Sequence, residues 1–240
     1  MRGNLKLLYQ PYKWLFLFPF VALCTLILGS MCIIASFLVS VEATNIFAVI
    51  WAKIACSLVP LKVNFIGKEN FSEKKSYVIV ANHQSMVDII IFHAYLGLKI
   101  KWIMKKELED VPFFGYACKK LGCIYVDRSN HTSAIAAMRQ AEKNLAETSS
   151  VIFFPEGTRS RDGKLLDFKK GAFHFALATG LPILPVTIKG SGDILPALSY
   201  DVTPGLATLV AHPAIEMKNR QIEDIDKILA LTKKLIADAL

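Results

Sequence analysis

Residues 76–88 read SYVIVANHQSMVD, an apolar β-branched run followed by a polar turn. The run at 76–81 predicts a buried strand because it is short and rich in β-branched residues. Ser85 and Asp88 have the S-x-x-D spacing that begins helices, so a helix is expected near 86–97. A buried strand that turns at once into a helix is the repeating unit of α/β folds.

The same pattern continues along the chain. Six further apolar runs predict strands at 61–67, 100–104, 122–126, 150–154, 183–188 and 207–211. Helical stretches are expected near 131–147, 169–179 and 221–239. Strands alternating with helices predict an α/β domain with a mostly parallel central sheet flanked by helices. We assign this domain to residues 60–240 and N-terminal membrane-associated helices to residues 1–59.

The N-terminal part is apolar enough to enter a membrane. No charged residue occurs from Trp14 to Ser40, a stretch longer than the roughly 20 residues that cross a bilayer core. Residues 43–59 have apolar side chains at helical spacing. They predict a second helix that lies in the interface or packs on the first, although a core helix of the α/β domain is the alternative. We therefore expect an N-terminal membrane-embedding helical pair.

The formal net charge of +8 suggests attraction to anionic lipid or to a phosphorylated substrate. The sequence has no nucleic-acid-binding motif, and an embedded N-terminus argues against such a partner. None of the five cysteines forms a C-x-x-C pair, so neither a zinc nor a redox site is indicated. Their odd number suits a reducing compartment.

Polar clusters follow the predicted strands, where ligands of parallel sheets bind. On one helix, His83 and Asp88 would diverge by about 140°. They meet only if His83 lies in the turn and Asp88 in the first helical turn. Asp88 would then orient the imidazole of a general base. In the alternative reading, Asp88 only caps the helix.

The stretch FFPEGTRSR (153–161) is the second cluster. Its proline and glycine shape a turn after a buried strand, and its guanidinium groups suit a phosphate. A solvated surface turn is the alternative. The third feature, DRS (127–129), follows the strand at 122–126, and Lys105 follows the strand at 100–104. We expect the three strand ends to converge on one site.

Taken in order, NHQSMVD, KKELEDVPFFG with GCIYVDR, FPEGTRS and LPILPV resemble the four motif blocks of the glycerolipid acyltransferase family. The resemblance covers roughly residues 60–190. It implies that His83 is the general base and Asp88 its orienting partner, acting without an acyl-enzyme. It also implies that the acceptor is bound by Glu156, Gly157, Thr158, Arg159, Lys105 and Arg128, with Arg159 on the phosphate.

The resemblance implies transfer of an acyl chain from acyl-ACP or acyl-CoA to the sn-2 hydroxyl of lysophosphatidate, giving phosphatidate for phospholipid biosynthesis. It implies no metal and no bound cofactor. Because Arg2, Lys6 and Lys13 predict a cytoplasmic N-terminus, the helical pair should return the catalytic domain to the cytoplasmic face of the inner membrane. Three alternatives stay open: an acceptor such as glycerol-3-phosphate or another lysolipid, an inactive membrane adaptor, and a serine hydrolase that uses Ser85.

Overall fold

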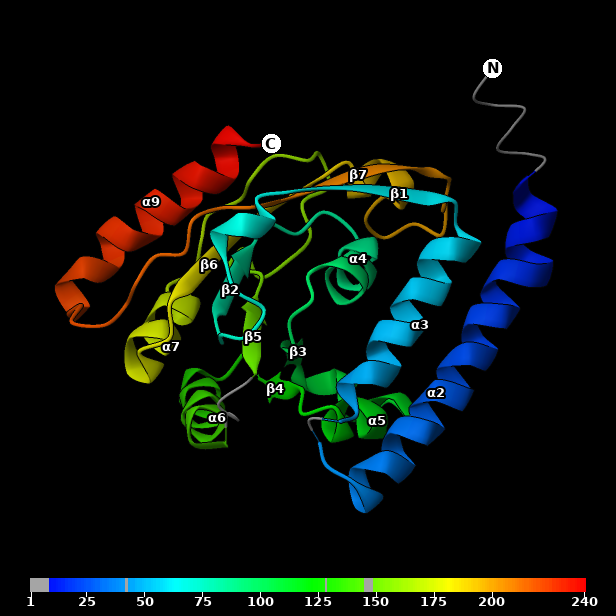
Figure 1. Ribbon diagram of the computed structural model, residues 1–240, viewed down its shortest axis with the longest axis horizontal. Helices are drawn as coiled ribbons and strands as arrows, with labels where there is room; N and C mark the ends of the chain where they lie inside the picture. The colour runs from blue at the N-terminus through cyan, green and yellow to red at the C-terminus, as the bar shows by residue number, and fades with distance from the viewer. Residues whose placement is uncertain (1–8, 42, 128, 145–148) are drawn as a thin grey trace.

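A central sheet organises the chain in the computed structural model, which describes residues 9–41, 43–127, 129–144 and 149–240 (Figure 1). Its seven strands lie in the order β1-β7-β6-β2-β5-β3-β4. They are β1 (Leu61–Ile66), β2 (Val78–Ala81), β3 (Ile100–Lys105), β4 (Ile124–Val126), β5 (Ser150–Phe153), β6 (Ile183–Lys189) and β7 (Gly205–Ala211). The α/β class with a mostly parallel sheet is therefore confirmed.

Strand direction decides where a site forms. β2 pairs in parallel with both β5 and β6, and β3 pairs in parallel with β5 and β4. β7 is antiparallel to β6 and parallel to β1, so β1 and β7 run against the other five strands. The carboxyl ends of β2, β5, β3 and β4 thus share one edge of the sheet, which is where parallel sheets bind ligands.

Helices cover both faces of the sheet (Figure 1). One face packs the core around α4, and the opposite face packs the core around α7 and α9. The helices of the α/β part are α4 (Val87–Tyr95), α5 (Phe114–Lys120), α6 (His131–Asn144), α7 (Gly171–Thr179), α8 (Ser191–Ile194) and α9 (Ile225–Asp238). Short 3-10 turns occur at η2 (Lys68–Asn70), η3 (Lys106–Leu108) and η4 (Ile222–Asp224). The sequence did not predict α5 or α8.

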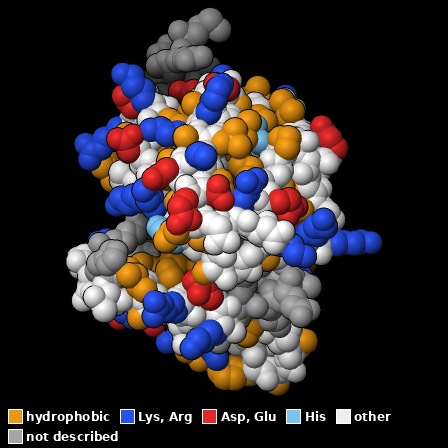
Figure 2. Space-filling view, turned by 90° about the vertical axis from the view of Figure 1, so that its left-hand side faces the viewer, with side chains coloured by type: hydrophobic (Ala, Val, Ile, Leu, Met, Phe, Trp, Pro, Cys, Tyr) orange, Lys and Arg blue, Asp and Glu red, His pale blue; other side chains and the backbone are white. Residues whose placement is uncertain are grey.

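The outer face of the layer formed by α7 and α9 carries both positive and negative side chains. Figure 2 shows Lys and Arg side chains interspersed with Asp and Glu over this side of the molecule. Three ion pairs account for part of the pattern: Lys170–Asp226 at 2.6 Å, Lys233–Asp167 at 2.7 Å and Lys234–Asp238 at 2.5 Å. The net positive charge is therefore not gathered into one basic patch on this side.

The N-terminal helices form an antiparallel pair beside the domain (Figure 1). A continuous helix runs over Tyr9–Leu38 and includes the π-helical turn η1 (Lys13–Leu17) and α2 (Phe18–Leu38). It is 30 residues long and apolar enough to cross a membrane. The second helix, α3 (Asn45–Leu58), packs between α2 and α4, and Trp51 Nε1 donates to Thr25 Oγ1 of α2 at 2.9 Å.

The second helix contacts the domain through small side chains. Its buried residues are Ala48, Ala52, Ala55 and Cys56. Small side chains let two helices approach closely, so α3 joins the helical pair to α4. α2 makes a further contact with the region of α5, because a Cβ on Gly29 would lie 2.8 Å from the Phe113 ring. The helical pair is therefore packed against the α/β part through both of its members.

Candidate active site

His83 and Asp88 are in direct contact at the carboxyl end of β2. His83 lies in the turn after the strand, and Asp88 lies in the first turn of α4. His83 Nδ1 and Asp88 Oδ2 are 2.8 Å apart, and the side chains are 13% and 0% exposed. An acceptor at Nδ1 holds a proton there and leaves Nε2 as the basic nitrogen. The arrangement suits a general base with an orienting carboxylate.

Asp88 also caps α4. Its Oδ2 accepts hydrogen bonds from the backbone amides of Gln84 at 2.9 Å and Ser85 at 3.0 Å, in addition to His83. The other oxygen, Oδ1, is buried and has no hydrogen-bond partner among the described residues. The same carboxylate oxygen therefore fixes the helix start and the imidazole. The contact with the imidazole and the contacts with the backbone before α4 therefore coexist, and the role of His83 as a base stays a prediction.

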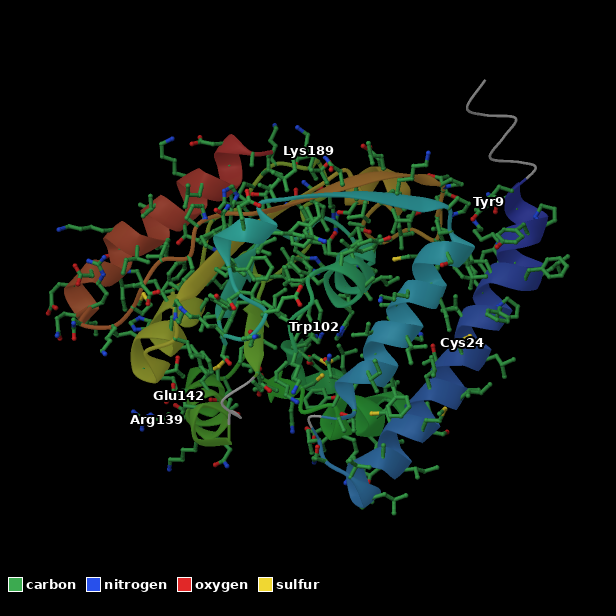
Figure 3. All side chains as sticks on the ribbon, viewed as in Figure 1. Tyr9, Cys24, Trp102, Arg139, Glu142 and Lys189 are labelled. Atoms are coloured by element: carbon green, nitrogen blue, oxygen red, sulfur yellow. The ribbon has the colours of Figure 1, made fainter. Side chains whose placement is uncertain are left out.

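The imidazole of His83 stacks on Phe154, the residue after β5. The ring centroids are 3.8 Å apart and the planes differ by 7°. The centroid of the Phe154 ring is 5.9 Å from that of Trp102, and Trp102 lies in the interior of the molecule (Figure 3). The face of Phe154 therefore forms a flat platform against which the His83 ring packs. The sequence analysis did not identify Phe154 as a site residue.

The buried side chain of His93 holds Trp102, which packs against Phe154. Trp102 Nε1 donates to His93 Nε2 at 2.6 Å, which fixes the indole on β3. Burial lowers the pKa of His93 to about 4, so the ring is neutral near pH 7 and accepts the hydrogen bond. His93 had no recognisable partner in the sequence. The chain of contacts from His93 through Trp102 and Phe154 reaches His83.

Glu156 connects the second motif cluster to the first. Its Oε1 accepts from the backbone amide of His83 at 2.8 Å, and its Oε2 accepts from that of Leu166 at 2.8 Å. Burial raises the pKa of this carboxyl, whose side chain is among the buried charged groups. The Ser160 amide also donates to the His83 carbonyl at 2.8 Å. Two of the three strand-end clusters therefore converge, and Glu156 positions the His83 turn.

The remaining predicted residues lie in different surroundings. Gly157 has φ +75°, which favours glycine, and Thr158 beside it is exposed. Arg159 is half-buried and forms no ion pair with any described acidic residue. Lys105 pairs with Glu107 at 2.6 Å, and its side chain is 58% exposed. Arg128 lies outside the described residues, so its role stays a prediction, while its neighbour Ser129 donates from its amide and its hydroxyl to Asp127 Oδ1.

Two polar residues of NHQSMVD have structural partners that the sequence did not indicate. The Asn82 side chain donates to the Ile188 carbonyl and accepts from the Ile188 amide, both at 2.8 Å. Ser85 Oγ donates to the Leu195 carbonyl at 2.7 Å and accepts from the Val87 amide at 3.1 Å. Asn82 therefore holds the turn to β6, and Ser85 holds it to the segment that follows β6. The Ser85 hydroxyl is thus used both as a donor and as an acceptor of hydrogen bonds with the main chain.

Comparison with known proteins identifies relatives. The family model described as Acyltransferase matches residues 62–189. The chloroplastic 1-acyl-sn-glycerol-3-phosphate acyltransferase LPAT1 of Arabidopsis thaliana is 37% identical over 174 residues, which are 71% of this chain and 48% of that protein. The human 1-acyl-sn-glycerol-3-phosphate acyltransferase alpha is 31% identical over 166 residues, covering 69% of this chain and 59% of the human protein. The chain spans about half the length of the curated relatives it matches.

A solved structure extends the similarity to the whole chain. The crystal structure of the 1-acyl-sn-glycerophosphate (LPA) acyltransferase PlsC from Thermotoga maritima superposes with a TM-score of 0.80 at 28% identity. The match covers 100% of this chain and 96% of that one. The likeness therefore includes the N-terminal helices as well as the sheet and the His83 turn.

Proposed function

Because this chain belongs to the acyltransferase family, we propose that it transfers an acyl chain from an acyl thioester to the sn-2 hydroxyl of lysophosphatidate, giving phosphatidate. The observation that carries the proposal is the His83–Asp88 pair, held at 2.8 Å at the carboxyl end of β2. The loop that contains Arg159 is bonded to the same turn through Glu156 and Ser160. A base and a phosphate-binding cation would thus act on one small acceptor.

In this mechanism, His83 Nε2 takes the proton of the sn-2 hydroxyl as the oxygen attacks the thioester carbonyl. The tetrahedral intermediate collapses and expels the thiolate, which receives the proton from the imidazolium. Asp88 and the face of Phe154 stabilise the imidazolium between the two proton transfers. The acyl group passes directly from the thioester to the lipid oxygen, so no acyl-enzyme forms.

A serine hydrolase using Ser85 is disfavoured by its contacts. The Ser85 hydroxyl donates to a main-chain carbonyl, so it is not directed at the imidazole of His83. Nucleophilic serines need their base within hydrogen-bond reach. A direct transfer from thioester to lipid hydroxyl therefore fits the turn better than a two-step route through Ser85.

We propose that Arg159 binds the acceptor phosphate, with Lys105 and Arg128 adding positive potential and Gly157 and Thr158 shaping the loop. An Arg159→Ala variant is expected to raise the KM for lysophosphatidate by about 10- to 100-fold, because a charge-assisted hydrogen bond contributes about 1.5–3 kcal/mol. Initial rates at varied lysophosphatidate concentration measure this. Arg161→Ala is the matched control, since Arg161 is exposed two residues away.

An acceptor panel separates the phosphate role from a general loss. With 1-acylglycerol as the acceptor, which lacks the phosphate, Arg159→Ala and wild type should show equal rates of acyl transfer. A loss of equal size with both acceptors would contradict the assignment of Arg159 to the phosphate. The same panel includes glycerol-3-phosphate and other lysolipids. If acyl transfer to one of these were faster than to lysophosphatidate, that compound would be assigned as the acceptor instead.

We further propose that the helical pair inserts into the inner membrane and leaves the catalytic domain on its cytoplasmic face. The 30-residue apolar helix and the lipid nature of both acceptor and product support this. Acyl-ACP or acyl-CoA would then reach the site from the cytoplasm. In bacterial cells, a reporter fused to the C-terminus of the full chain should be cytoplasmic, and a periplasmic reporter would exclude this topology.

A further inference from the structure

A pair of cysteines lies where α5 ends and the chain turns toward β4. Gly122 has φ +79°, and its amide donates to the Lys119 carbonyl at 3.0 Å. The Cys123 amide donates to the Cys118 carbonyl at 3.0 Å. These two hydrogen bonds define a Schellman motif, in which the side chains at the Cys118 and Cys123 positions commonly touch.

The motif places the two cysteine side chains beside each other. Each thiol is close enough to shift the pKa of the other. The backbone hydrogen bond between the same residues keeps their main chains close, and a disulfide needs Cα atoms roughly 4.4–6.8 Å apart. The spacing is C-x-x-x-x-C, which is why the sequence indicated no redox pair. The helix ending supplies the proximity that a C-x-x-C motif would otherwise provide.

The surroundings of the two thiols differ. The neighbouring Cys118 thiol, the backbone at Trp102 and the charge of Lys101 lower the pKa of Cys123. The neighbouring Cys123 thiol and burial raise the pKa of Cys118. Lys101 is itself buried and donates from Nζ to the Leu121 carbonyl at 2.8 Å, so its charge is fixed beside the turn. Cys123 is half-buried, whereas Cys118 is 9% exposed.

We propose that Cys118 and Cys123 form a reversible oxidation site, in which a hydroperoxide converts the two thiols into an intramolecular disulfide. The Cys123 thiolate attacks the peroxide oxygen, the O–O bond breaks, and Cys123 becomes a sulfenic acid as hydroxide leaves. The Cys118 sulfur then attacks the Cys123 sulfur and displaces water. Two thiols and one hydrogen peroxide thus give one disulfide and two waters.

The site lies beside the contact between α5 and α2. Cys32 of α2 is buried, and its Sγ lies 4.0 Å from the Ala117 carbonyl oxygen, one residue before Cys118. Cys32 is therefore the rival partner for either thiol. The Schellman hydrogen bonds favour the Cys118–Cys123 pair, because they hold both residues within one turn of chain.

The test uses the purified full-length chain in detergent with hydrogen peroxide in slight excess, followed by alkylation of free thiols and peptide mass spectrometry. The number of alkylated cysteines should fall from five to three, with one peptide joining Cys118 to Cys123. Dithiothreitol should restore all five. Cys24→Ser, in the apolar α2 helix (Figure 3), should leave the disulfide unchanged.

Single replacements identify the reactive thiol. Cys118→Ser should accumulate sulfenic acid at Cys123, trapped by dimedone, while Cys123→Ser should leave Cys118 reduced. A wild-type chain that keeps five free thiols under these conditions would overturn the proposal. So would a disulfide that includes Cys32, or over-oxidation of Cys123 without cross-linking.

Discussion

Replacement of His83 by alanine is expected to lower kcat for acyl transfer to lysophosphatidate by about 10²- to 10⁴-fold, the range that a general base contributes. The fold should persist, because the Glu156 and Ser160 hydrogen bonds go to the backbone of His83 and not to its side chain. The main loss in packing is the stack on Phe154. Phosphatidate formation at saturating substrate measures kcat, and thermal unfolding checks the fold.

The control for this substitution is His174→Ala. His174 is exposed on α7, so its removal should leave kcat unchanged within about twofold. A His83→Ala enzyme with wild-type kcat and a normal melting temperature would contradict the assignment of the base. The inactive-adaptor alternative would be favoured by two results together: neither the wild type nor His83→Ala transfers acyl chains, and His83→Ala still functions fully in cells.

Replacement of Asp88 by asparagine is the second large effect, and it separates charge from position. The asparagine oxygen can accept the three hydrogen bonds now received by Oδ2, while its amide nitrogen takes the place of the unpartnered Oδ1. The imidazole then keeps its orientation but loses the charge that stabilises the imidazolium. We expect kcat to fall by about 10²- to 10⁴-fold, as in other His–Asp pairs.

The same variant has a stability readout. A buried amide without a partner costs about 1–3 kcal/mol, so Asp88→Asn should unfold at lower denaturant concentration but remain folded in buffer. Asp162→Asn is the matched control, since Asp162 lies in the neighbouring loop with a 59% exposed side chain. If kcat of Asp88→Asn matched that of Asp162→Asn, Asp88 would be a helix cap alone.

The sequence predicted the features that depend on neighbouring residues. The strands follow from local apolar runs, and the His83–Asp88 contact follows from a turn and a helix start within seven residues, 82–88. Two short helices escaped prediction: α8 has only 4 residues, and α5 has 7 and contains Gly115. Gly115 lies in α5 because a Cβ there would be 2.1 Å from the Glu109 carbonyl oxygen.

The missed features join residues that are far apart in the chain. Glu156 reaches the His83 amide across 73 residues, and Asn82 reaches Ile188 across 106 residues. The order of strands in the sheet decides both contacts, and no local pattern encodes that order. Phe154 is a similar case, since a phenylalanine after a strand reads as core until the fold brings His83 onto its face.

The central claim is that His83 activates the lipid hydroxyl for direct attack on the thioester. The most direct measurement mixes purified enzyme with a radiolabelled acyl thioester, first without and then with lysophosphatidate, and follows the label on protein and on lipid. The account predicts no label on denatured protein in either case and label in phosphatidate once lysophosphatidate is present. Stoichiometric label on Ser85, or no label in phosphatidate with either acyl-ACP or acyl-CoA, would contradict it.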